Sequence, residues 1–170
     1  MTRAVLSIGS NLGDRLAMLR SVVDGLGDAV RAASPVYETA PWGGVDQDPF
    51  LNAVVIADAP GLDGRGWLQR AHELERSADR VRTQRWGPRT LDVDIVTCHA
   101  DGAELVSCDA ELTLPHPRAH QRAFVLVPWL AIEPDAVLTV AGRAHRVDEL
   151  LAALDATERD GVRRTDLVLS

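Results

Sequence analysis

Short apolar runs alternate with segments of helical spacing in the first hundred residues. Apolar runs and alternating apolar and polar positions predict strands, which fall at residues 4–9, 30–38, 50–57 and 91–95. Spacings of three and four residues predict two amphipathic helices, with stripes of Leu16, Leu19, Val23 and Leu26 and of Trp67, Ala71, Leu74 and Ala78. This order predicts an α+β fold: a ferredoxin-like βαββαβ antiparallel sheet with both helices packed on one face, plus C-terminal additions.

The rest of the chain carries weaker patterns. Pro115 and Pro117 favour an extended loop at LTLPHP, because the residue before a proline avoids helix. A short buried segment, a small strand and a short amphipathic helix are expected at residues 124–132, 137–140 and 147–154. Residues 156–170 show no periodicity, and we expect a loosely ordered tail there with one added strand. With 170 residues, the chain is expected to form a single domain, residues 1–170.

One face of the third predicted strand combines an aromatic ring with an amide. Alternation places Phe50, Asn52, Val54 and Ile56 on the same side. An Asn on an apolar face must find hydrogen-bond partners, either in the protein backbone or on a ligand. Together with Phe50 it suits a flat heterocycle, because the ring stacks and the amide offers a donor and an acceptor to an aminopyrimidinone edge.

Residues 80–96 concentrate the charged chemistry. Four arginines fall within ten positions, at Arg80, Arg82, Arg85 and Arg89. Asp92 and Asp94 then alternate with apolar residues, so both carboxylates are expected on one face of a strand. Paired carboxylates suit Mg²⁺, which completes its shell with water and phosphate oxygens, and arginine suits phosphate. With the ring of Trp86 between the two groups, the segment predicts a site for a Mg²⁺–nucleoside polyphosphate.

Each part has a simpler interpretation when taken alone. Alternating acids are common on the solvated face of an edge strand, and a run of arginines is common in a solvated loop. A Trp before Gly-Pro, as at Trp86, is usually part of core packing. The conjunction favours a ligand site, because four neighbouring cations repel one another unless an anion lies among them.

Composition narrows the classes of partner. The net charge of −7 disfavours a nucleic-acid partner, because nucleic-acid-binding proteins usually present a basic face. The two cysteines, Cys98 and Cys108, have no metal-ligand or CxxC spacing and are expected to be reduced. We expect no signal peptide and no membrane span, and therefore a cytoplasmic protein.

Four stretches together resemble one known family. They are SIGSNLGDR, SPVYETAPWGGVDQDPFLNAV, RVRTQRWGPRTLDVDIV and LTLPHPRAHQRAFVLVPWL. The chain is similar over residues 4–135 to the 6-hydroxymethyl-7,8-dihydropterin pyrophosphokinases of folate biosynthesis. The resemblance implies transfer of pyrophosphate from ATP to the hydroxymethyl group of 6-hydroxymethyl-7,8-dihydropterin, with release of AMP. It also implies two Mg²⁺ ions bound with ATP, and we expect a monomer.

The same resemblance assigns roles to individual positions. It implies catalytic roles for Arg80, Arg89, Asp92 and Asp94, with the two aspartates holding the metal. Contacts with ATP are implied for Glu75, Arg82, Trp86, Arg89, Ile95, Thr113, His116 and Arg122. Contacts with the pterin are implied for Thr39, Trp42, Phe50, Asn52, Trp86 and Phe124. The chain departs from some family members at His72, Thr83 and Pro117, which affects details of the nucleotide pocket and not the metal pair.

Two other classes of protein share parts of the pattern. Nucleotidyltransferases of the polymerase-β kind pair a Gly-Ser turn with a DxD strand, but here Gly9-Ser10 and Asp92 lie about eighty positions apart. A small-molecule sensor on a ferredoxin-like fold is the second alternative, since a fold does not determine a function. A sensor has no evident need for paired acids beside several arginines.

Overall fold

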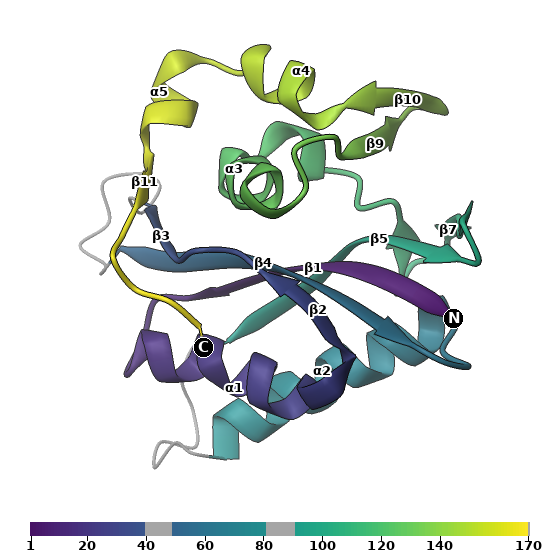
Figure 1. Cartoon of the computed structure of the whole chain (residues 1–170), viewed down its shortest axis with the longest axis horizontal. Helices are drawn as coiled ribbons and strands as arrows, with labels where there is room; N and C mark the ends of the chain where they lie inside the picture. Colours follow the sequence, from purple (N-terminus) through teal and green to yellow (C-terminus); the bar gives the residue numbers. More distant parts are fainter. Residues whose placement is uncertain (40–48, 81–90, 170) are drawn as a thin grey trace.

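A central antiparallel sheet organises the molecule. The computed structural model describes residues 1–39, 49–80 and 91–169, without the side chains of residues 79 and 80. In its middle, β1 (Thr2–Ser10) pairs antiparallel with β4 (Phe50–Ala59) on one side and with β5 (Asp92–Ala100) on the other. The full order is β11-β3-β4-β1-β5-β6, with β2 also paired to β4 (Figure 1). The outer strands are β2 (Val30–Ala33), β3 (Tyr37–Thr39), β6 (Ala103–Glu104) and β11 (Val162–Arg164).

The strand predicted over residues 30–38 is two strands, β2 and β3. Ser34 and Pro35 interrupt it, and proline has no N–H to give to a strand partner. The Ser34 hydroxyl instead accepts a hydrogen bond from the Val54 N–H at 2.9 Å. The break sends β3 along the far end of β4, where Thr39 pairs with Phe50.

Helices α1 (Arg15–Leu26) and α2 (Gly64–Arg80) cover one face of the sheet (Figure 1). The stripe predicted for α2 is confirmed, since Trp67, Ala71, Leu74 and Ala78 are all buried. In α1 the predicted stripe is partly wrong. Leu19 and Leu26 are buried, but Leu16 and Val23 only pack at the margin of the core. Met18 and Val22 take the central places.

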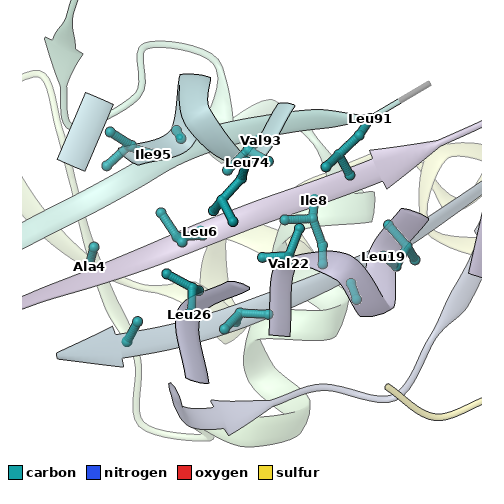
Figure 2. Packing of buried hydrophobic residues seen from close by; sticks show 14 of the residues in the cluster. Ala4, Leu6, Ile8, Leu19, Val22, Leu26, Leu74, Leu91, Val93 and Ile95 are labelled. Atoms are coloured by element: carbon teal, nitrogen blue, oxygen red, sulfur yellow. The ribbon is translucent and has the colours of Figure 1, made fainter. Parts of the chain in front are cut away.

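Side chains from both helices and from β1, β4 and β5 form most of the core on that face. Figure 2 shows Leu6 and Ile8 of β1 between Leu19 and Val22 of α1 and Leu74 of α2. Val93 and Ile95 of β5 point to the same side. Because side chains alternate along a strand, this packing turns Asp92 and Asp94 to the other face of the sheet.

A second layer covers that other face, as Figure 1 shows. Its main element is α3 (Ala123–Ile132), which packs on β4. The sequence indicates a buried segment there without its type, because a helix that is apolar on all sides has no periodicity. The smaller elements of this layer are β9 (Val137–Val140), β10 (Arg143–Arg146), α4 (Val147–Ala152) and α5 (Ala156–Asp160). The hairpin of β7 (Ser107–Cys108) and β8 (Thr113–Leu114) lies instead beside β5, with Leu114 in the first core. Val54 and Ile56 join this second core, on the face predicted for them.

The C-terminal segment crosses the edge of the sheet. After α5, β11 pairs with β3, with Val162 opposite Thr39. The chain then continues past α1, and Leu169 is buried in the first core (Figure 1). The Arg20 guanidinium donates to the Val168 carbonyl at 3.1 Å. Residues 156–169 therefore connect the second layer to the first around β3.

Two remaining predictions concern the cysteines and the membrane. Cys98 is buried and Cys108 is exposed, and both are free thiols. Across the described residues, the structure has no helix of the length and apolar character needed to cross a membrane.

Candidate active site

A cavity of about 830 Å³ lies between the sheet and its second layer. Its floor is the end of the sheet where β1 finishes, β4 begins and β5 begins. One wall comes from the segment that leads into α3, and another from the turn between α4 and α5. Seven of the residues singled out from the sequence line it: Thr39, Phe50, Asn52, Asp92, Asp94, Arg122 and Phe124.

The acidic end of the cavity is formed by the first residues of β5. Asp92 and Asp94 both face the cavity, as the alternation predicts. In the antiparallel register Gly9 lies opposite Asp92 and Ser7 lies opposite Asp94. The Arg122 guanidinium approaches the Asp94 carboxylate at 3.9 Å, which is an ion pair too long for a hydrogen bond.

Glu75 of α2 supports this end from the other face of the sheet. Its Oε2 accepts a hydrogen bond from the Val93 N–H at 3.2 Å. In the described residues β6 pairs with β5 only at His99 and Ala100, so this part of the β5 edge has no neighbouring strand. Glu75 thereby holds the backbone between the two cavity aspartates, a contact that only the folded structure reveals.

The aromatic end of the cavity lies across the sheet from the acids. Asn52 is 5% exposed, and its Nδ2 donates to the Thr39 hydroxyl at 2.8 Å. The rings of Phe50 and Phe124 line the cavity beside it. Arg122 lies over the Phe124 ring, with Cζ 5.6 Å from its centroid, at the distance of a cation–π contact. Arg122 thus contacts both ends of the cavity.

His116 lies behind the acidic end. Its backbone N–H donates to the Val96 carbonyl at 2.8 Å, which ties the loop to β5. Its Nδ1 accepts from the Arg118 N–H at 3.1 Å. Burial lowers the pKa of the His116 imidazole below its ordinary value, while the Asp94 carboxylate acts in the opposite direction. The imidazole is therefore neutral at pH 7, and its lone pair on Nδ1 is directed at the backbone.

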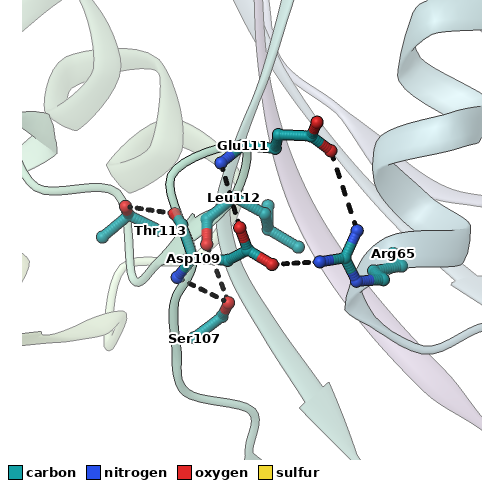
Figure 3. Close-up of polar contacts among 6 residues, drawn as sticks. All are labelled: Arg65, Ser107, Asp109, Glu111, Leu112 and Thr113. Carbon is teal, nitrogen blue, oxygen red and sulfur yellow. Dashed lines mark hydrogen bonds and ion pairs between the residues drawn. The ribbon is translucent and has the colours of Figure 1, made fainter.

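Two other predicted nucleotide contacts lie away from the cavity lining. Ile95 is 5% exposed and packs in the core under α1 and α2, so only its backbone is available on the cavity side. Thr113 is exposed, and its hydroxyl donates to the Asp109 carbonyl at 3.3 Å. Figure 3 shows Thr113, the first residue of β8, beside the turn that Arg65 of α2 holds through Asp109 and Glu111.

Several predicted residues lie outside the described part of the chain. These are Trp42, Arg82, Trp86 and Arg89. The side chain of Arg80 also lies outside the described part.

The cavity also includes residues that the sequence did not single out. Arg118 and Gln121 come from the short helix η3 (Ala119–Gln121) and its preceding residue. Asp155 and Glu158 come from α5 and its preceding turn. Ser7 and Gly9 lie on the floor, and alternation along β1 together with the strand order could have identified them. Nothing in the pattern of residues 155–158 indicates a site.

Comparison with known proteins identifies the family. Residues 5–134 match the family described as 7,8-dihydro-6-hydroxymethylpterin-pyrophosphokinase (HPPK). The 2-amino-4-hydroxy-6-hydroxymethyldihydropteridine pyrophosphokinase of Mycobacterium leprae is 67% identical, over 99% of this chain and 92% of that protein. The protein of the same name from Methylorubrum extorquens is 44% identical, over 98% of this chain and 100% of that protein.

Solved structures agree on the fold. The Plasmodium falciparum HPPK-DHPS wild-type structure superposes with a TM-score of 0.62 at 12% identity, over 89% of this chain. A triple mutant of the same protein, S436F/A437G/A613T with STZ-DHP, gives a TM-score of 0.66 at 11% identity, over 96% of this chain. The chain spans 44% and 46% of those two longer chains. By its match over most of its length, the chain belongs to the 7,8-dihydro-6-hydroxymethylpterin-pyrophosphokinase family.

Proposed function

We propose that this cavity transfers the pyrophosphoryl group of ATP to the hydroxymethyl group of 6-hydroxymethyl-7,8-dihydropterin, the pyrophosphokinase step of folate biosynthesis. The observation that carries the proposal is the pairing of two unlike ends in one cavity. One end has two aromatic rings and a buried amide, and the other has two carboxylates beside arginine. The family and the names of the relatives support the same reaction.

The aromatic end is suited to the pterin. Phe50 and Phe124 offer ring faces for stacking, and Asn52 is held so that its amide reads the pyrimidinone edge. The hydrogen bond from Nδ2 to Thr39 fixes the amide orientation and leaves Oδ1 as the acceptor for an N–H of the ring. Trp42 and Trp86 are proposed to complete this subsite.

The acidic end is suited to the triphosphate with magnesium. In the described residues no group of three or more His, Cys, Asp or Glu side chains is placed to hold a metal ion. Two carboxylates on one face of β5 fit Mg²⁺, which takes its other ligands from phosphate and water. Asp92 and Asp94 would hold two such ions, which when bound neutralise charge on the attacking and leaving oxygens.

The chain's own residues then orient the two substrates. The hydroxymethyl oxygen attacks the β-phosphorus of ATP and loses its proton to water, a new O–P bond forms, and the bond from the β-phosphorus to the oxygen bridging to the α-phosphorus breaks, so AMP leaves. Arg122 lies between the two ends and Arg118 lies on the same wall, where both can neutralise phosphate oxygens. Holding both substrates in one geometry supplies much of the acceleration in such transfers.

The remaining residues implied by the resemblance keep their proposed roles. Arg80 and Arg89 are proposed to act on the transferred phosphates. Contacts with ATP are proposed for Glu75, Arg82, Trp86, Arg89, Ile95, Thr113, His116 and Arg122. For Ile95 the proposal is limited to the backbone, because its side chain is in the core.

The finer description of the fold belongs to the same proposal. The core order β1-α1-β2/β3-β4-α2-β5, with β4 beside β1 and β1 beside β5, supports a ferredoxin-like unit. We also propose that residues 1–170 act as a single-domain monomer in the cytoplasm. Light scattering of the purified protein and fractionation of cells test these two points.

An assay of products distinguishes the proposed reaction from its alternatives. Purified protein with Mg²⁺, ATP and 6-hydroxymethyl-7,8-dihydropterin should form AMP, and omission of the pterin should abolish AMP formation. Release of free pyrophosphate would instead indicate nucleotidyl transfer. Binding of ATP and the pterin by calorimetry without any turnover would indicate a sensor.

A further inference from the structure

The cavity opens where the central strand carries small residues. On the cavity face β1 carries Val5, Ser7 and Gly9 in alternation. Val5 fills the space below the second layer, whereas Ser7 and Gly9 line the cavity. The small side chain of Ser7 and the absence of a side chain at Gly9 therefore leave the space that forms the floor of the cavity.

Gly9 lies between the two ends of the cavity. In the sheet register it is opposite Asn52 on β4 and opposite Asp92 on β5. Neighbouring strands are about 4.8 Å apart, so this row of three residues spans roughly 10 Å. A ligand that reaches from the Asn52 amide to the Asp92 carboxylate must pass over Gly9.

The Asn52 amide lies against the Gly9 backbone. A Cβ atom at Gly9 would be 2.8 Å from Asn52 Oδ1 and 3.7 Å from the Leu51 carbonyl oxygen. The first distance is shorter than Cβ atoms tolerate, so Asn52 would have to move. It has little room to do so, because it is 5% exposed and its Nδ2 is bound to the Thr39 hydroxyl.

We infer that Gly9 is a positioning residue for the pterin subsite, and that the absence of a side chain there sets the orientation of the Asn52 amide. This inference rests on the proposed function, because it assumes that Asn52 reads the pterin. A side chain at position 9 displaces Oδ1, breaks the bond to Thr39, and also covers the floor between the amide and Asp92. The atoms nearest to the added Cβ belong to Asn52 and Leu51, so the affinity for the nucleotide should change little.

The test is Gly9→Ala, measured by calorimetric titration in the presence of Mg²⁺ and a non-hydrolysable ATP analogue. We expect the Kd for 6-hydroxymethyl-7,8-dihydropterin to rise at least about tenfold, the cost of a misplaced hydrogen-bonding group of about 1.4 kcal/mol. The Kd for the ATP analogue should change less than about twofold, and the NMR signal of the Asn52 side-chain amide should shift.

Gly25→Ala is the matched control. A Cβ at Gly25 would be 2.6 Å from Leu74 Cδ2, a similarly tight contact on the opposite face of the sheet. This variant should keep wild-type affinity for the pterin whatever its melting temperature. Equal losses of pterin affinity in both variants would overturn the inference, because they would reveal a general effect of destabilisation.

A double-mutant cycle keeps the inference testable if Gly9→Ala folds poorly. In the Asn52→Ala background the clashing atom is absent, so the double variant should fold, and adding Gly9→Ala there should cost less pterin affinity than it does alone. If Gly9→Ala raised the Kd for the pterin by the same factor with and without Asn52, the role of Asn52 would be overturned. Wild-type protein that binds no pterin at all would instead refute the proposed function, whereas a wild-type Kd in folded Gly9→Ala would refute only this inference.

Discussion

Two hollows lie on the same face of the sheet, and they differ in how their charges are used. The second hollow, of about 560 Å³, lies at the opposite end of β1 and is lined by Arg3, Asp58, Asp101 and Glu133 among others. Its charges neutralise one another: Asp58 accepts hydrogen bonds from Arg3 and Arg31 at 3.0 Å each, and the N-terminal ammonium pairs with Asp101 at 3.0 Å.

The candidate active site has the reverse arrangement. Its ion pair between Arg122 and Asp94 is 3.9 Å long. Arg118, Asp155 and Glu158 form no ion pair with any residue that the structure describes. A charge that already has a partner contributes to folding, whereas a charge held without a close partner is available to a ligand. The comparison therefore separates a structural cluster from a functional one, although both are polar and concave.

The largest effect is expected from removing one charge of the active site. Asp94→Asn should lower kcat by roughly 10²–10³-fold, the usual cost of losing one group that stabilises the transition state. The melting temperature should change little, because the Asp94 side chain is half exposed and outside both cores. Steady-state AMP formation and a thermal melt measure the two quantities. A wild-type rate in a folded variant would show that Asp94 does not hold the metal.

A smaller effect is expected from the residue that supports the acidic end. Glu75→Ala removes the acceptor for the Val93 N–H and should raise the Mg²⁺ concentration for half-maximal activity by about 10–100-fold, as losses of supporting contacts at metal sites do. Glu75→Gln keeps an acceptor and should shift it much less. Similar shifts in both variants would mean that the charge of Glu75 matters and its hydrogen bond to β5 does not.

The sequence predicts the α1–α2 side of the molecule better than the α3 side. The α2 stripe and the direction of Asp92 and Asp94 follow from periodicity, which is a local property of the chain. Helix α3 has no polar side to reveal its type, and Pro128 lies inside it. Strand β11, with the sequence Val-Arg-Arg, does not alternate and forms only because β3 offers an open edge.

The residues of the site also differ in how well the sequence predicts them. Phe50, Asn52, Asp92 and Asp94 lie on two strands whose parity can be read directly. Gly9 and Glu75 act through contacts between elements, and these depend on a register that no local pattern contains. Asp155 and Glu158 lie at the cavity in a part of the chain that is followed by the pairing of β11 with β3, which is a long-range contact.

The smallest effect is expected from the paired charges of the second hollow. The hydrogen bond from Arg3 holds the pKa of the Asp58 carboxyl below its ordinary value of 3.8, opposed by burial and helped by Arg31. The ionised carboxylate therefore stabilises the fold above about pH 4, and this contribution is lost as the pH falls through the lowered pKa. Asp58→Asn should reduce the free energy of unfolding at pH 7 by about 1 kcal/mol or less and leave AMP formation unchanged, and its difference in stability from the wild type should shrink as the pH falls below about 4. Urea unfolding at pH 7, 5 and 3 measures this, and a loss of activity in Asp58→Asn at pH 7 would show that the two hollows are not separate in function.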